Sequence, residues 1–177
     1  MGSASAPSFY DEGESVFTQE RPGYHEKIFK LVKFRTMTNE RDAEGKLLPD
    51  EQRLNSYGKL LRSTSLDELP EAINILIGDM SIIGPRPWFV KYLPLYTPEQ
   101  HRRPDVRPGL SRWAQVKGRN KASGEDRINM DLWYVDHVSL GLDIKIIFMT
   151  IGKALKREGI NSETSATMEE FKGTEKE

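Results

Sequence analysis

The chain is organised around Ser65-Leu66-Asp67-Glu68-Leu69-Pro70-Glu71, which a short apolar segment separates from Gly84-Pro85-Arg86-Pro87. Two adjacent carboxylates stand at an expected helix start. Ser65 and Glu68 have the spacing of a capping box, whereas Asp67 as the N-cap suits Pro70 better, because a proline so early in a helix loses no intrahelical hydrogen bond. Either way, free N–H groups and the helix dipole favour an anion there. Plain helix capping explains the pair as well, so both interpretations stay open.

The composition describes one globular domain. The chain has 177 residues, of which 37% are hydrophobic and 30% charged, enough for a single core. A net charge of -1 argues against general nucleic-acid binding. There is no cysteine, so disulfides and thiolate chemistry are excluded, and the three histidines lack zinc-ligand spacing. No run of about 18 apolar residues suggests a membrane-spanning helix.

Hydrophobic periodicity predicts an α+β fold: a mainly helical single domain with an N-terminal β-hairpin and surface amphipathic helices. Strands are expected at residues 16–20 and 27–37, around a proline-glycine turn. Helices are expected at residues 51–62, 67–77, 125–137 and 142–157, with a short one opening at Thr97. Leu69, Ile73 and Leu76 are expected to face inward in the central helix. In the last helix one apolar side is formed by Ile144, Ile147, Phe148, Ile151 and Leu155. The last helix suits a protein core or a membrane surface.

The two ends of the chain are polar. Residues 1–14 are interpreted as a tag or disordered tail, and residues 161–177 as a disordered acidic tail. The domain itself is expected to span residues 15–160.

Chemistry is suggested by the carboxylate pair and by a basic segment. Residues 101–121 contain seven cationic side chains against the single acid Asp105. This segment is either a solvated surface or an anion pocket. A glycosidase pair ranks low, because neighbouring residues point poorly for attack from opposite sides of a bond. A Mg²⁺ site with substrate phosphates and a carboxylate nucleophile attacking phosphorus remain, and the two are compatible. Phosphate oxygens would then contact Arg86, Arg107, Arg112 and Arg119.

Several longer motifs occur in a fixed order. They are Phe17-Thr18-Gln19-Glu20-Arg21-Pro22-Gly23, Lys33-Phe34-Arg35-Thr36-Met37, Arg62-Ser63-Thr64-Ser65-Leu66-Asp67-Glu68-Leu69-Pro70, Gly78-Asp79-Met80-Ser81-Ile82-Ile83-Gly84-Pro85-Arg86-Pro87, Arg107-Pro108-Gly109-Leu110-Ser111 and Gly118-Arg119-Asn120. Over about residues 15–155 the chain resembles the bacterial sugar transferases, the small monotopic phosphoglycosyl transferases.

The resemblance implies a reaction and its participants. Such enzymes use Mg²⁺ to move a sugar-1-phosphate from a UDP-sugar to polyprenol phosphate (undecaprenyl phosphate), releasing UMP. They begin the assembly of exopolysaccharide, lipopolysaccharide or another glycoconjugate on the cytoplasmic face of the bacterial inner membrane. The implied partners are the UDP-sugar, the polyprenol phosphate and the membrane surface, with downstream glycosyltransferases beyond them. No nucleic acid is among them.

The resemblance also implies residue roles. Asp67 matches the nucleophile that carries a covalent phosphosugar, and Glu68 matches its acidic partner; both are candidate Mg²⁺ ligands. Arg86 matches a phosphate-binding arginine, Arg119 lies in a motif associated with the nucleotide-sugar, and Asp143 falls in a further family motif. Lys33 and Arg62 match basic positions near the membrane face, where the lipid phosphate approaches.

One departure from the family pattern concerns the N-terminus. The family has a hydrophobic re-entrant helix before the first strand, whereas residues 1–14 here are polar. We therefore expect this chain to be soluble. The alternative function is a non-catalytic membrane-surface anion-binding module of the same fold. An intact Asp67-Glu68 pair favours the enzyme, because a pure binding module needs no nucleophile beside its arginines.

Overall fold

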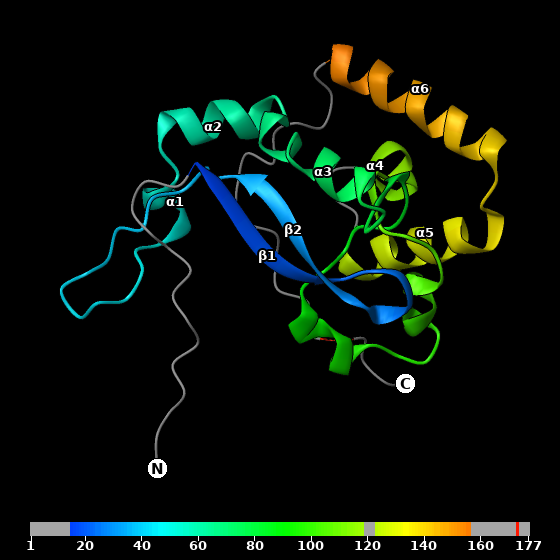
Figure 1. The fold of residues 1–177 in the computed structure, drawn as a ribbon, viewed down its shortest axis with the longest axis horizontal. Coiled ribbons are helices and arrows are strands. Elements are labelled where there is room, and N and C mark those ends of the chain that lie inside the picture. Colours follow the sequence, from blue (N-terminus) through cyan, green and yellow to red (C-terminus); the bar gives the residue numbers. More distant parts are fainter. Residues whose placement is uncertain (1–14, 119–122, 157–172, 174–177) are drawn as a thin grey trace.

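The computed structural model describes residues 15–118, 123–156 and 173 (Figure 1). The hairpin expected at the N-terminus is confirmed. Strands β1 (Val16–Pro22) and β2 (Ile28–Phe34) pair antiparallel, and Pro22 lies opposite Ile28 beside the turn. Phe29 and Leu31 of β2 turn inward and pack with Met80, so one face of the hairpin covers a small apolar cluster. Both expected polar ends, residues 1–14 and 161–177 apart from residue 173, lie outside the described residues.

The single helix expected at residues 51–62 is wrong. Two helices occur instead, α1 (Asp50–Arg53) and α2 (Ser56–Ser63). Asn55 separates them, and its side-chain oxygen accepts a hydrogen bond of 2.8 Å from the backbone N–H of Gly58. An asparagine that caps a new helix holds an extended backbone and so interrupts the previous one.

The central helix is shorter than expected and faces the other way. A 3-10 helix (Leu66–Glu68) precedes α3 (Glu71–Leu76). The expected inward-facing residues are wrong, because Leu69, Ile73 and Leu76 are 58%, 53% and 86% exposed.

The buried residues of α3 are Glu71 and Asn74. The Asn74 Oδ1 accepts from the backbone N–H of Val32 at 3.0 Å, and its Nδ2 donates to the Lys30 carbonyl at 2.8 Å. The asparagine thus hydrogen-bonds to backbone groups of β2 in addition to those that pair with β1. A buried sheet edge needs such polar partners, and this decides which side of α3 turns inward.

The second half of the chain contains a short parallel sheet that the sequence analysis missed. Strand β3 (Ser81–Ile83) pairs with β4 (Gly109–Ser111). A Cβ added to Gly109 would lie 2.0 Å from the backbone nitrogen of Gly84, so no larger residue fits this crossing. Two 3-10 helices, Val90–Leu95 and Gln100–Asp105, lie between the strands, and the latter stands where a helix opening at Thr97 was expected.

Three helices complete the domain: α4 (Trp113–Lys117), α5 (Gly124–His137) and α6 (Leu140–Lys156). Ser123 and Asp126 form a capping box at the start of α5, and the expected helix there is confirmed. In α6 much of the apolar side lies at the surface, because Ile144, Phe148, Ile151 and Leu155 are exposed, whereas Ile146 is fully buried. Ile146 packs with Ile83 and Tyr134, which joins α6 to β3 and α5.

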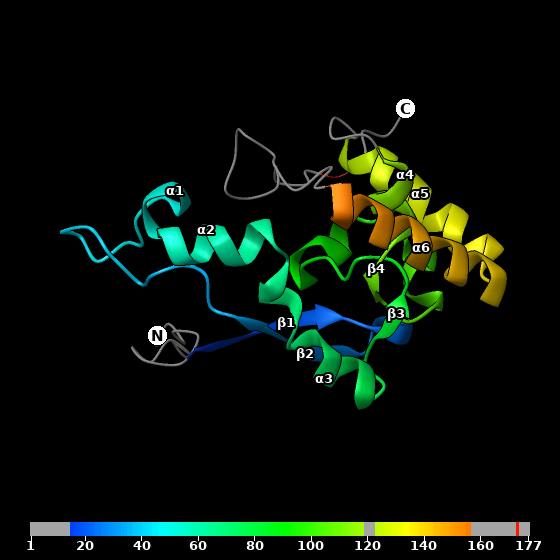
Figure 2. The ribbon, with the colours of Figure 1, turned by 90° about the horizontal axis from the view of Figure 1, so that it is seen from above.

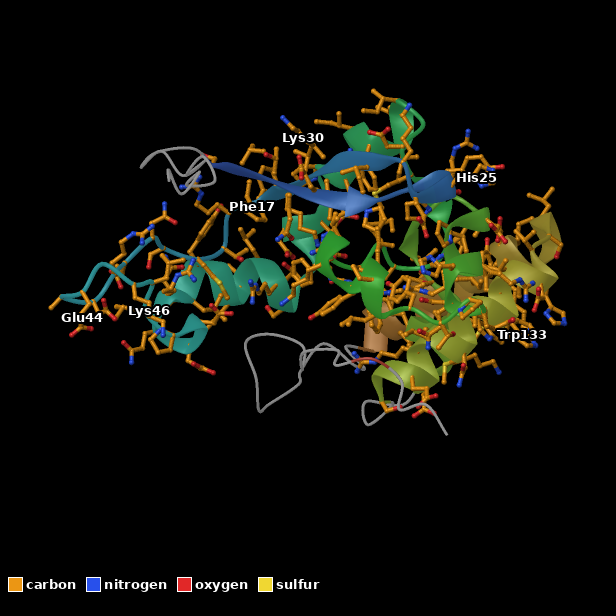
Figure 3. The ribbon with its side chains drawn as sticks, turned by 90° about the horizontal axis from the view of Figure 1, so that it is seen from below. Phe17, His25, Lys30, Glu44, Lys46 and Trp133 are labelled. Carbon is orange, nitrogen blue, oxygen red and sulfur yellow. The ribbon has the colours of Figure 1, made fainter. Side chains whose placement is uncertain are left out.

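The arrangement is seen in the figures. Helices α2, α3 and α6 occupy the upper half of the view in Figure 1, and Figure 2 shows α6 crossing above the short β3–β4 sheet. The loop before α1 extends from the body, with Glu44 and Lys46 at its tip, at the opposite end of the molecule from Trp133 of α5 (Figure 3). Among the described residues, no helix is long and apolar enough to cross a membrane. The mixed helix and strand content with an N-terminal hairpin confirms the α+β class.

Candidate active site

Asp67 and Glu68 lie in the 3-10 helix that links α2 to α3. Ser65 takes a left-handed backbone conformation with φ of 56°, and its side chain caps nothing. Both N-caps considered for this helix are therefore wrong, because α3 begins only after Pro70. A three-residue turn has no α-helix dipole to keep Asp67 ionised. Other charges must set the protonation of the two carboxylates.

Glu68 is held by cations. Its Oε1 lies 2.9 Å from the Nζ of Lys33 and 3.7 Å from the Nη1 of Arg86. Burial alone would raise its pKa, but Arg86, Lys33 and Arg112 outweigh burial and lower the pKa of Glu68 to about 2. Glu68 is therefore a permanent carboxylate in this site.

Asp67 has the opposite environment. Burial and the neighbouring charge of Glu68 raise the pKa of Asp67 above its ordinary value, and Lys33 and Arg62 only partly oppose this. No side-chain donor in the described part of the chain hydrogen-bonds to its carboxylate. Two adjacent carboxylates whose pKa values are driven apart have separate roles. Glu68 is committed to cations, and Asp67 remains available to a ligand.

Glu71 is a member of the site that the sequence analysis missed. Its Oε1 lies 2.9 Å from the Nζ of Lys33, so one ammonium group bridges Glu68 and Glu71. Burial raises the pKa of Glu71, and Lys33 opposes the rise. A regular polar spacing could have revealed Glu71 from the sequence, because polar residues recur every third position at Glu68, Glu71 and Asn74. This polar spacing is as regular as that of the apolar residues in the same segment.

The two basic residues expected near a lipid phosphate lie beside this cluster. Lys33 is mostly buried between the two glutamates. The Nε of Arg62 donates to the Thr36 hydroxyl at 3.0 Å, which directs the arginine along the end of β2. Both contribute positive charge around Asp67. The contact of either with a lipid phosphate stays a prediction.

Two of the expected phosphate-binding arginines converge here. Arg86 approaches Glu68, and Arg112 of the segment between β4 and α4 acts on the same carboxylate. Burial and the charge of Arg86 lower the pKa of the Arg112 guanidinium. The Arg112 guanidinium makes no hydrogen bond to the described residues, and an anion between the two arginines would relieve their repulsion.

The remaining expected residues lie elsewhere. Arg107 donates from Nε to the Gly78 carbonyl at 3.0 Å, at the far end of α3. Asp143 of α6 accepts a hydrogen bond of 2.6 Å from the Tyr134 hydroxyl, within the packing between α5 and α6. Arg119 lies outside the described residues.

The donor set fits Mg²⁺ only with help from a ligand. No group of three or more histidine, aspartate or glutamate side chains with metal-binding geometry occurs within the described ranges. Mg²⁺ commonly takes one or two protein carboxylates together with substrate phosphates and water. Asp67 and Glu68 suit that pattern, with substrate phosphates and water completing the coordination.

An α+β domain with paired carboxylates beside convergent guanidinium groups has the charges that a phosphorylated ligand could bind. The family model of the bacterial sugar transferases matches residues 3–157. The chain therefore belongs to the bacterial sugar transferase family.

Curated relatives agree with this assignment. Over 158 residues the chain is 52% identical to the "Uncharacterized sugar transferase EpsL" of Bacillus subtilis, covering 89% of this chain and 78% of that protein. It is 38% identical to the "UDP-glucose:undecaprenyl-phosphate glucose-1-phosphate transferase" of Klebsiella pneumoniae, covering 85% and 34%. It is also 38% identical to the "UDP-N-acetylgalactosamine-undecaprenyl-phosphate N-acetylgalactosaminephosphotransferase" of Aeromonas hydrophila, covering 78% and 35%. The chain thus spans about a third of the length of the last two.

Proposed function

We propose that this protein is a phosphoglycosyl transferase that moves a sugar-1-phosphate from a UDP-sugar to undecaprenyl phosphate, releases UMP and so begins the synthesis of a cell-surface glycan. The names of the Klebsiella and Aeromonas relatives support a UDP-sugar as the donor and undecaprenyl phosphate as the acceptor. The two names carry different sugars, so the sugar itself is left open. The observation that carries the proposal is the half-buried Asp67, whose carboxylate has no side-chain hydrogen-bond donor among the described residues, beside a Glu68 that Lys33 and Arg86 hold.

The proposed chemistry has two displacements at one phosphorus. A carboxylate oxygen of Asp67 bonds to the β-phosphorus of the UDP-sugar, and the bond from that phosphorus to the bridging oxygen breaks as UMP leaves. An oxygen of undecaprenyl phosphate then attacks the same phosphorus and releases Asp67. A carboxylate is a weak nucleophile, so in-line positioning and neutralisation of the phosphate must supply the activation.

The surrounding side chains suit this demand. Arg86 and Arg112 bring two guanidinium groups to the place where a diphosphate would lie, and Glu68 limits their mutual repulsion before the substrate arrives. A Mg²⁺ ion held by Asp67 and Glu68 would neutralise diphosphate charge when bound. Lys33, shared by Glu68 and Glu71, offsets part of the negative charge of both glutamates.

The site opens beside an apolar surface that we propose faces the membrane. The exposed apolar side chains of this surface lie in or directly beside α2, the following 3-10 helix, α3 and α6, elements in the upper half of Figure 1. They are Leu60, Leu66, Leu69, Ile73, Leu76, Ile77, Leu140, Ile144, Phe148, Ile151 and Leu155. So many exposed apolar residues on neighbouring elements mark an interaction surface. A lipid acceptor would then reach Asp67 from the bilayer on the cytoplasmic side.

Intact-mass analysis tests the proposal. Incubation with UDP-sugars and Mg²⁺, without acceptor, should leave a phosphosugar adduct on the wild type and none on the Asp67→Asn variant. The amide keeps the shape of the side chain, so nucleotide binding should persist in that variant. An adduct on another residue, or turnover by Asp67→Asn, would contradict the covalent step. Binding of the UDP-sugar without any adduct or turnover would favour the non-catalytic module instead.

A further inference from the structure

The loop that carries Arg86 is anchored at every backbone carbonyl from Pro85 to Pro87. The Pro85 carbonyl accepts from the N–H of Gly109 at 3.0 Å, and the Pro87 carbonyl accepts from Nη1 of Arg21, also at 3.0 Å. The Arg86 carbonyl accepts from Nη2 of Arg103 at 2.8 Å. Prolines flank Arg86 and restrict the backbone further.

The Arg103 side chain is itself fixed by a buried partner. Its Nη2 and Nε donate to Oδ2 of Asp131 at 2.7 Å and 3.2 Å, and its Nη1 donates to the Tyr96 hydroxyl at 2.7 Å. Arg103 and Asp131 are only 4% and 2% exposed. Asp131 comes from α5, so the interaction joins α5 to the Arg86 loop through one guanidinium plane.

We propose that Arg103 and Asp131 are positioning residues, which act on the diphosphate of the UDP-sugar through the backbone of Arg86. This inference rests on the proposed function, because Arg86 is its point of contact with substrate. Arg103 and Asp131 do not touch the substrate. They hold the Arg86 carbonyl, and with it the direction in which the Arg86 side chain leaves the loop.

Stability alone is a poor explanation for this pair. A buried ion pair gains little over well-packed apolar residues of similar volume, because both charges must leave water. Lysine, with a single ammonium group, cannot reproduce the planar fork of arginine, which here reaches Asp131, Tyr96 and the Arg86 carbonyl at once. The site needs this geometry, since small errors in the position of a phosphate-binding group weaken both binding and in-line attack.

The test is a double-mutant cycle between positions 103 and 86. Affinity for UDP and for inorganic pyrophosphate is measured by titration calorimetry on the full chain, with Mg²⁺ present. Arg103→Lys should weaken binding by about tenfold in the wild-type background, and by less than about twofold in the Arg86→Ala background, because the group it positions is gone. Arg102→Lys is the matched control: Arg102 is the adjacent arginine and pairs with Glu99 and Asp136 at the surface. It should bind as the wild type does.

A second variant distinguishes the loss of positioning from the loss of folding. The Arg103→Met/Asp131→Leu pair replaces both charges with apolar side chains, and its thermal unfolding should stay near that of the wild type while its UDP affinity falls as in Arg103→Lys. Equal losses in the two Arg86 backgrounds, or no loss in the wild-type background, would overturn the inference. Failure of the wild type to bind UDP or to form the adduct would instead overturn the proposed function.

Discussion

The ammonium group of Lys33 lies 2.9 Å from Oε1 of Glu71, a carboxylate that is almost wholly buried in the first turn of α3. The same ammonium lies 2.9 Å from Oε1 of Glu68. One lysine of β2 therefore offsets the negative charge of two carboxylates, one in the 3-10 helix and one in α3.

We expect Lys33→Met to destabilise the protein by roughly 3 kcal/mol near neutral pH, because it leaves buried carboxylates without their cation. The pKa of Glu71 is raised from its ordinary value of 4.5, so below that pH Glu71 is protonated in both states and its part of the loss disappears. Glu68, with a folded-state pKa of about 2, stays ionised near pH 3, so the loss should shrink there without vanishing. Urea unfolding near pH 7 and near pH 3 measures the difference. Lys33→Met/Glu71→Leu should recover part of the loss. A loss that does not vary with pH would contradict the ion-pair account.

Asp67→Asn should stabilise the fold near neutral pH. The pKa of Asp67 is raised in the folded state, chiefly by burial and then by Glu68, so the ionised side chain costs stability there. That cost is absent once the pH falls below the ordinary value of 3.8, where both states are protonated. The gain should therefore vanish in acid. A pH series of denaturant unfolding provides the measurement.

The matched control for Asp67 is Asp126, whose pKa is lowered by the backbone N–H and hydroxyl of Ser123 in the capping box. Asp126→Asn should change stability in the opposite direction. Destabilisation by both substitutions would refute the conclusion that the ionised Asp67 side chain lowers the stability of the fold.

Asn74→Leu should cost about 2–4 kcal/mol, because a side chain of similar volume would leave the Val32 N–H and the Lys30 carbonyl without partners. Ala72→Leu, on the exposed side of the same helix, is the control and should have little effect. Urea unfolding compares the two. If Asn74→Leu is tolerated, water or a shift of α3 satisfies the edge of β2.

Mg²⁺ should strengthen the binding of UDP, because a cation between the diphosphate and the two carboxylates reduces their repulsion. Titration calorimetry with Mg²⁺ and with excess chelator measures the effect. In Glu68→Gln, which loses one negative charge and one ligand, the benefit of Mg²⁺ should be smaller. Equal affinities with and without the metal would remove it from the mechanism.

The proposed membrane surface predicts selective loss of vesicle binding. Ile73→Glu and Phe148→Glu introduce charge at exposed sites in α3 and α6 and should reduce co-sedimentation with anionic vesicles without changing the unfolding temperature. Ile28→Glu, at an exposed isoleucine of the hairpin, is the matched control and should bind as the wild type does. Equal reductions in all three variants would refute a defined membrane-facing surface.

The sequence by itself determined part of the local structure and several residues that lie together around Glu68. The hairpin followed from alternating residues around a proline-glycine turn, and α5 from its helical periodicity. Asp67, Glu68 and Arg86 were predicted to act together from ordered motifs, and the last two prove to be ion-paired at 3.7 Å. The hairpin and α5 depend on interactions between residues close together in the sequence. The site residues were found from ordered motifs, which can be read without knowing the fold.

Only the tertiary structure decided which faces turn inward and which charges meet. Periodicity divides α3 into an apolar and a polar side, but the unpaired edge of β2 requires hydrogen bonds, so Glu71 and Asn74 are buried and Ile73 is exposed. Of the arginines proposed for phosphate, Arg112 reaches the carboxylates while Arg107 lies at the other end of α3. Burial and ion pairing depend on what the rest of the chain places alongside, and that information is absent from the spacing of residues within one segment.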